Sequence, residues 1–242
     1  AESPDEYFWA GIGDAFSKGP EVELSSREVE LLHSPLMGRA LAAGACIEPL
    51  FDNAEQALAD KRSGVVSEAF ENVVLNIIVT AGIVSNMTTN LGAERGAYYF
   101  NSSTAHAFYN AFTALGERGE KHLHGEVVSF GTCVLYAFDG NRKALEEQVA
   151  LNRKLGLPTT LADLDITPET VDADLDIIVE RAQKTNEWGR APYGFTTDRF
   201  RQAILDTDAY GRAVAAGEKD LEAAALDAIA AHAPSAETAV PR

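Results

Sequence analysis

The sequence predicts an all-α protein. Apolar residues recur every three or four positions along most of its 242 residues, which is the period of one face of a helix. Helix start and stop signals bracket many of these stretches, and no segment of useful length alternates apolar and polar residues as a half-buried strand would. With 46% hydrophobic and 24% charged residues, the chain has the composition of a soluble globular protein with a sizeable core.

The first half of the chain predicts two long helical stretches. One covers about residues 26–60 and breaks near Pro35 and Pro49, because proline lacks the backbone N–H that a helix interior requires. The other covers residues 66–84, where apolar side chains occupy so broad a face that we expect a largely buried helix.

The second half carries clearer helix boundaries. Thr167-Pro168-Glu169 combines a hydroxyl cap, a proline at the first helical position and an acid in the first turn. Gly156 followed by Pro158 is a typical helix stop. The predicted helices begin near residue 104 and near residue 168, and span about residues 125–138, 142–155, 197–210 and 221–231.

Residues 86–103 interrupt the helical pattern. They are rich in Asn, Thr, Ser and Gly, include the aromatic residues Tyr98, Tyr99 and Phe100, and lead directly to His106. A long irregular loop inside a compact domain is uncommon and is often functional. The alternative is a surface excursion held in place by its aromatic side chains. The position directly before His106 favours the functional interpretation.

The net charge of −17 excludes partners that need basic patches, such as nucleic acid and anionic lipid. Cys46 and Cys133 lie in apolar surroundings and are expected to be buried free thiols. The first residues are acidic and do not resemble a secretion signal. The longest apolar stretch, residues 73–84, is interrupted by Asn76 and Thr80 and is too short to span a bilayer. We therefore expect a cytoplasmic protein without a membrane partner.

Asp14, His106 and His124 are the candidate catalytic residues and the candidate ligands of one divalent metal. One carboxylate and two neutral imidazoles leave a coordination position open for a substrate oxygen, as in a catalytic zinc site. The two histidines lie at the starts of consecutive predicted helices, which a turn could bring together, whereas only the tertiary fold can deliver Asp14. From the spacing of these residues in the sequence alone, each could instead cap a helix or pack in the core.

The remaining histidines and the glycine-containing sequences give weaker indications of a functional site. We expect His122 to support the candidate site or to lie at the surface, and His33 and His232 to face solvent. The Gly-Ile-Gly sequence that ends at Gly13 has neither the preceding strand nor the third glycine of a dinucleotide-binding loop. The chain also has no nucleophile elbow, phosphate loop or paired-cysteine zinc motif.

Segments in matching order resemble the glycerol dehydrogenase-like group of the iron-containing, metal-dependent alcohol dehydrogenase superfamily. Residues 10–15 (AGIGDA) resemble the first metal-ligand helix of that family, residues 105–110 (AHAFYN) the second, and residues 124–131 (HGEVVSFG) the third. Residues 155–164 resemble a downstream turn and residues 208–211 the closing helix. The resemblance extends over nearly the whole chain.

By this resemblance the fold is the all-helical C-terminal domain of the dehydroquinate synthase-like and iron-containing alcohol dehydrogenase proteins, with zinc held by Asp14, His106 and His124. Such an ion lowers the pKa of an alcohol, so that hydride can pass from its carbon to NAD. Fe²⁺ is less favoured than Zn²⁺, because the extra histidines of iron-type members have no match. We expect residues 1–242 to form a single metal-binding catalytic domain from which the family's N-terminal nucleotide-binding domain is absent.

The chain departs from the family pattern near the metal motifs. Tyr109 stands three residues after His106, where glycerol dehydrogenases carry another histidine, and Val127 stands where a lysine is usual. Residues 86–103 are longer and more polar than the glycine-rich family equivalent, which leaves the substrate open.

The leading hypothesis is an NAD-linked dehydrogenase of a polyol, a small alcohol or a hydroxy acid, with its nucleotide-binding domain supplied by another chain or segment and with a homo-oligomeric assembly. Two alternatives stay open. One is a stand-alone metal-dependent lyase or isomerase of the same superfamily. The other is a non-catalytic helical assembly subunit.

Overall fold

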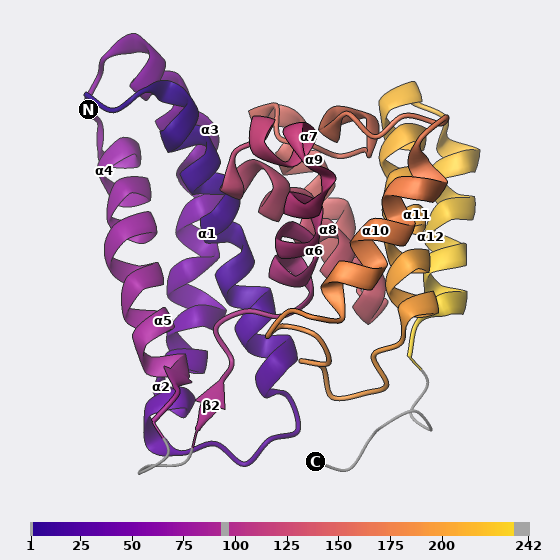
Figure 1. Ribbon diagram of the computed structural model, residues 1–242. Coiled ribbons are helices and arrows are strands. Elements are labelled where there is room, and N and C mark those ends of the chain that lie inside the picture. Colours follow the sequence, from indigo (N-terminus) through magenta and orange to yellow (C-terminus); the bar gives the residue numbers. More distant parts are fainter. Residues whose placement is uncertain (1, 93–96, 235–242) are drawn as a thin grey trace.

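The computed structural model describes residues 2–92 and 97–234, and the regular structure of this part of the chain is almost entirely helical (Figure 1). The all-α prediction is therefore confirmed. The elements in chain order are α1 (Asp5–Ser26), α2 (His33–Leu41), η1 (Ala42–Cys46), α3 (Glu48–Ser63), α4 (Glu68–Leu75), η2 (Asn76–Thr80), α5 (Ala81–Thr88), β1 (Thr89–Asn90), β2 (Tyr98–Tyr99), α6 (Thr104–Phe112), η4 (Thr113–Leu115), α7 (Glu117–Lys121), α8 (His124–Asp139), α9 (Arg142–Leu155), η5 (Ala162–Leu164), α10 (Val171–Ala182), α11 (Thr197–Ala216) and α12 (Lys219–His232).

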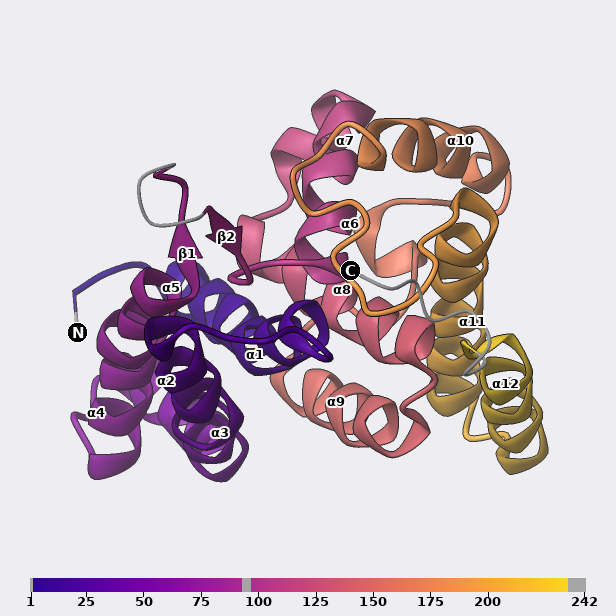
Figure 2. The same cartoon turned by 90° about the horizontal axis from the view of Figure 1, so that it is seen from below.

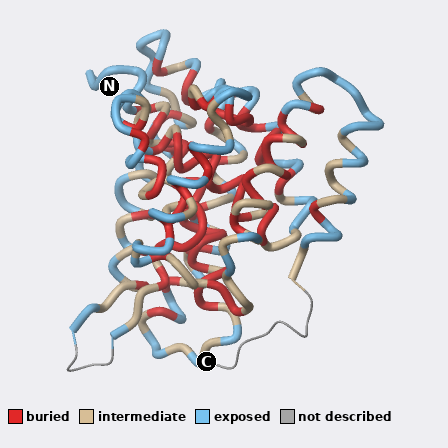
Figure 3. Tube along the Cα trace, turned by 45° about the vertical axis from the view of Figure 1, so that its right-hand side comes forward, coloured by how far each residue is buried: buried red, intermediate tan, exposed pale blue. Residues whose placement is uncertain are grey.

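Helix α8 lies at the centre of the molecule. It contacts α1, α6, α9 and α11, and its side chains are mostly buried. Seen from below, α1 to α5 gather on one side of it and α10 to α12 on the other (Figure 2). Phe130 and Val134 of α8 pack with Phe108 of α6 and Phe200 of α11 in the larger core cluster. Buried residues accordingly concentrate in the middle of the fold (Figure 3).

A second core cluster lies between α1, α3, α4 and α9. Phe8, Ile12, Ala15 and Phe16 of α1 contribute to it, and their spacing of three and four residues places them on one face of that helix. The opposite long edge of α1 faces α6 and α8. Helix α1 therefore joins the two halves of the core, and Asp14 lies on its side toward α6 and α8, where it meets His106 and His124.

The segment between α5 and α6 is held by a few specific bonds. Thr89–Asn90 pairs antiparallel with Tyr98–Tyr99, a two-residue ladder that the sequence did not predict. Residues 93–96, part of the predicted irregular segment, lie outside the described residues. The Phe100 N–H donates to the Thr88 carbonyl at 2.9 Å, and the Phe100 carbonyl accepts from the Ser25 hydroxyl at 2.8 Å. These bonds fix the chain just before α6, the helix that carries His106.

The continuous helical run Glu68–Thr88 is long and apolar enough to cross a membrane, judged by length and composition alone. In the fold it packs against α1, α2 and α3, but Leu75, Ile78, Val79 and Ile83 are exposed, so the prediction of a largely buried helix is wrong. Its buried Asn76 donates to the Ala45 and Cys46 carbonyls at 2.7 and 3.3 Å, which ties the middle of the run to η1. A single helix of this kind is weak evidence for a membrane span, because core helices of soluble proteins meet the same criterion.

Candidate metal centre

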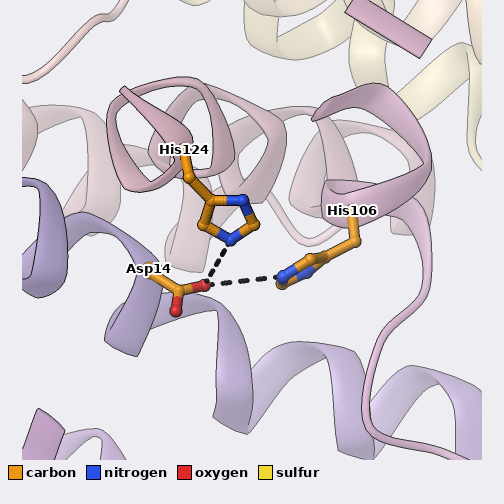
Figure 4. A group of neighbouring side chains, drawn as sticks. All are labelled: Asp14, His106 and His124. Atoms are coloured by element: carbon orange, nitrogen blue, oxygen red, sulfur yellow. Dashed lines mark ion pairs between the residues drawn. The ribbon is translucent and has the colours of Figure 1, made fainter. Parts of the chain in front are cut away.

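Asp14, His106 and His124 converge from three helices, α1, α6 and α8 (Figure 4). Their potential ligand atoms all lie within 4.8 Å of one another. Asp14 Oδ1 stands 3.5 Å from His106 Nε2 and 3.4 Å from His124 Nε2. In the part of the chain that the structure describes, these three residues are the one group whose donor atoms are arranged to share an ion.

Two close backbone contacts explain how residues so distant in sequence meet. A Cβ atom on Gly125 would lie 1.7 Å from the Ala10 carbonyl oxygen, and one on Gly13 would lie 2.4 Å from the Gly125 carbonyl oxygen. Helices α1 and α8 therefore touch backbone to backbone, which only glycine permits. Gly13 precedes Asp14 and Gly125 follows His124, so this contact places the two candidate ligands side by side.

A third close contact positions His106. A Cβ atom on Gly131 of α8 would lie 2.5 Å from the Ala105 carbonyl oxygen of α6. Ala105 immediately precedes His106, so α8 fixes α6 next to the candidate site just as it fixes α1.

Glu21 orients the His106 ring. This carboxylate of α1 is completely buried, and its Oε2 lies 2.6 Å from His106 Nδ1. Its Oε1 accepts the backbone N–H groups of Ser103 and His106 at 2.7 and 3.0 Å, which caps the start of α6. A carboxylate at Nδ1 assigns a proton to that nitrogen, so the lone pair of Nε2, the atom that faces Asp14, is left for a metal.

His124 is held from two sides at the first residue of α8. The Glu126 carboxylate accepts the Leu123 N–H at 3.0 Å, which fixes the start of the helix. The Tyr109 ring meets the His124 imidazole edge to face, with ring centroids 4.2 Å apart. The His124 side chain stays 44% exposed and that of Asp14 35%, against 12% for His106. The site is therefore closed on the His106 side and open to solvent on the side of the other two residues.

The charges of the site stabilise each other. Burial opposes ionisation of Asp14, yet the imidazoles of His106 and His124, together with the Lys18 ammonium, hold the Asp14 pKa well below its usual value. Burial likewise disfavours the imidazolium of His106, but the Glu21 and Asp14 carboxylates outweigh it and raise the pKa of His106 to about 9. The protonated His106 thus lies between the Glu21 and Asp14 carboxylates, and a metal cation bound at its Nε2 would replace a proton.

The donor set fits a small divalent ion such as zinc. Asp14 Oδ1 is buried and accepts no hydrogen bond, although it faces two imidazole nitrogens. Two ligands bound tetrahedrally to zinc at about 2.0–2.1 Å stand roughly 3.3 Å apart. The observed separations of 3.4 and 3.5 Å match this spacing. A buried carboxylate oxygen without a hydrogen-bond donor, set between two imidazoles, is the arrangement of a metal ligand.

The remaining histidines do not join this group. His122 pairs with Glu126 at 2.9 Å and with Asp165 at 3.3 Å, so it supports the start of α8 without facing Asp14. His232 pairs with Asp206 at 2.8 Å, a contact that the sequence did not predict.

Sequence reasoning missed Glu21, Lys18 and the contact role of Tyr109. Asp14, Lys18 and Glu21 follow one another at intervals of four and three residues, so they share one face of α1. That spacing is the signal that could have revealed the two additional residues.

Comparisons with known proteins give a consistent result, although no protein-family model matches the chain. The glycerol dehydrogenase of Escherichia coli O6:H1 is 32% identical over 217 residues, which are 88% of this chain and 55% of that protein. Hydroxycarboxylate dehydrogenase A of Escherichia coli K12 is 28% identical over 209 residues, 86% of this chain and 55% of that protein. The crystal structure of a probable glycerol dehydrogenase from Sinorhizobium meliloti aligns with a TM-score of 0.74 and 28% identity, covering 87% of this chain and 57% of that one. The chain spans about half the length of the curated relatives it matches.

Proposed function

We propose that this chain, which belongs to the glycerol dehydrogenase-like group of the iron-containing alcohol dehydrogenase superfamily, supplies the metal-binding catalytic part of an NAD-linked dehydrogenase. Its all-helical fold is that of the superfamily's C-terminal domain. The substrate would be a polyol, a small alcohol or a hydroxy acid, the last because one relative is named a hydroxycarboxylate dehydrogenase.

The observation that carries this proposal is the convergence of Asp14, His106 and His124. Three protein ligands satisfy a zinc ion only in part and leave a position for a substrate oxygen. The exposure of His124 and Asp14 supports an open position on the solvent side of the site, where a substrate could enter. A structural zinc site would instead be closed by a fourth protein ligand.

The proposal assigns a role to each residue of the candidate metal site. Zinc bound to the three ligands would supply electrostatic stabilisation of the negative charge that develops on the substrate oxygen. The ion would be held by Asp14, His106 and His124, and Glu21 would keep Nε2 of His106 directed at it. The Tyr109 ring would keep the His124 imidazole in place by packing against it.

The nicotinamide needs a binding site beyond these helices. We infer that a nucleotide-binding domain, from another segment or another chain, covers the exposed side of Asp14 and His124 and brings NAD to the substrate. The same proposal includes zinc rather than iron as the metal, a cytoplasmic location and a homo-oligomeric assembly.

The test is zinc-dependent NAD reduction by the chain combined with a nucleotide-binding domain, assayed with short 1,2-diols and 2-hydroxy acids. We expect reduction that a chelator removes and zinc restores. The His124→Ala variant should be inactive, whereas His232→Ala, which removes another carboxylate-paired histidine, should keep the activity. No zinc-dependent reduction with any of these substrates would contradict the proposal.

A further inference from the structure

Lys18 lies at the candidate site without a partner of its own. It follows Asp14 by one turn of α1 and precedes Glu21 by three residues, so all three share one face of the helix. The residue is only 7% exposed. Within residues 2–92 and 97–234, its ammonium makes no hydrogen bond and no ion pair. Lysines with so little exposure are almost always paired, so an anion on the solvent side of the site would give Lys18 the negative group that it lacks.

The other buried lysine of the chain shows the usual arrangement. Lys61 is 9% exposed and pairs with the Asp5 carboxylate at 2.9 Å and with the Ser3 carbonyl at 2.7 Å. Lys18 has nearly the same burial but none of these contacts. The difference lies in its surroundings, because Lys18 stands beside a site that is open to a ligand.

The charge balance of the site favours an anionic ligand. Lys18 lies one turn of α1 after Asp14 and three residues before Glu21, so its ammonium adds a positive charge to the helix face that carries both carboxylates. Once a divalent ion is bound, the two carboxylates balance its charge. Lys18 is then the positive charge of the site that no carboxylate balances, and an anionic ligand would compensate it.

We propose that Lys18 binds the carboxylate of a short 2-hydroxycarboxylate substrate whose hydroxyl oxygen takes the open metal position, so that the site prefers such acids to neutral diols. The inference rests on the proposed metal site and goes beyond it by assigning the substrate class to one residue. Hydroxyl and carboxylate stand on adjacent carbons in these acids. The hydroxyl could therefore bind the metal while the carboxylate binds the ammonium of Lys18, which lies one helical turn from the metal ligand Asp14.

The experiment compares glycolate with ethylene glycol, which carries an uncharged CH₂OH in place of the carboxylate. Binding to the cobalt-substituted protein is followed by its visible spectrum, which needs neither NAD nor turnover. We expect the wild type to bind glycolate at least about tenfold more tightly than ethylene glycol. Lys18→Met should lose about tenfold to a hundredfold in glycolate affinity, the usual loss for a charged hydrogen bond, and little for ethylene glycol. Lys61→Met is the matched control and should keep the preference.

The possible results distinguish a failure of the Lys18 proposal from a failure of the proposed metal-dependent function on which it rests. Failure of the wild type to take up cobalt or zinc would overturn both. Metal uptake without any preference for glycolate in the wild type would overturn the role of Lys18 alone, even if Lys18→Met failed to fold. Equal weakening of glycolate and ethylene glycol in Lys18→Met would do the same, since it would show that Lys18 only supports the ligands. Because removing a cation reduces repulsion, Lys18→Met should bind the metal at least as tightly as the wild type.

Discussion

Glu21 sets the charge state of the candidate metal centre. Burial disfavours its carboxylate, but the facing His106 and the nearby Lys18 hold its pKa below the usual value. Its charge in turn raises the pKa of His106 to about 9, against the opposing effect of burial. At neutral pH the metal-free protein therefore carries a proton on His106 that a metal must displace.

Zinc affinity should consequently depend on pH. Below about pH 9 His106 is protonated in the metal-free site, so its proton competes with zinc and the apparent affinity should rise up to tenfold per pH unit between pH 7 and 9. Above that range the rise through His106 should end. Calorimetry in buffers of different ionisation enthalpy measures both the affinity and the protons released. An affinity that stays constant from pH 7 to 9 would contradict the assignment.

Replacing Glu21 by glutamine should weaken zinc binding by about tenfold to a hundredfold, because His106 loses the carboxylate that orients it. The same change should reduce the pH dependence, since the charge that raises the His106 pKa is gone. Zinc titration of Glu21→Gln measures both effects. Glu23→Gln, on the same helix but paired with Arg27, is the control and should bind zinc like the wild type. Equal affinities for wild type and Glu21→Gln would exclude the orienting role.

Helix α8 positions all three candidate ligands. It starts with His124, touches the backbone of α1 through Gly125 and approaches α6 through Gly131. These helix contacts determine where the candidate ligands lie, because each contact is adjacent in sequence to one of the ligands.

Gly125→Ala should therefore separate α1 from α8. Its Cβ would lie 1.7 Å from a backbone oxygen, so the helices must move, at a cost of at least about 2 kcal/mol in the free energy of unfolding together with most of the zinc affinity. Urea unfolding and zinc titration measure the two losses. Gly82→Ala on α5 meets open space and should be neutral or stabilising by up to about 1 kcal/mol. A stable, zinc-binding Gly125→Ala protein would show that the close contact is dispensable.

The helices of the second half were largely predictable because their boundaries are local. Asn141 caps α9 and Gly156 ends it in a left-handed conformation, as the stop signal indicates. Helix α1 was harder, since Pro20 lies inside it and the predicted stretch 26–60 begins only where α1 ends. The positions of Asp14, His106 and His124 depend on backbone contacts between distant glycines. Periodicity does not encode such contacts, so the resemblance to a known family supplied what spacing could not.

The whole molecule brings together ligands that lie far apart in sequence, so the site exists only in the folded chain. A metal that binds the native state and not the unfolded one stabilises the fold by mass action, by about 4 kcal/mol at a free concentration one thousand times the dissociation constant. The alternative of a non-catalytic subunit without metal predicts no such effect.

Zinc should therefore raise the melting temperature of the wild type by about 10 °C at that degree of saturation, judged from the size of the chain. Asp14→Asn should lose most of this shift. Differential scanning calorimetry with zinc and with chelator provides the comparison. The same zinc-induced shift in Asp14→Asn as in the wild type would place the metal elsewhere.

The metal content of purified protein tests the central claim most directly. Elemental analysis should find one zinc per chain in the wild type and less than about a tenth of that in His124→Ala, because two remaining ligands hold zinc too weakly to survive purification. His232→Ala should retain the full amount. Undiminished stoichiometric zinc in His124→Ala would contradict the assignment of Asp14, His106 and His124 as the metal centre.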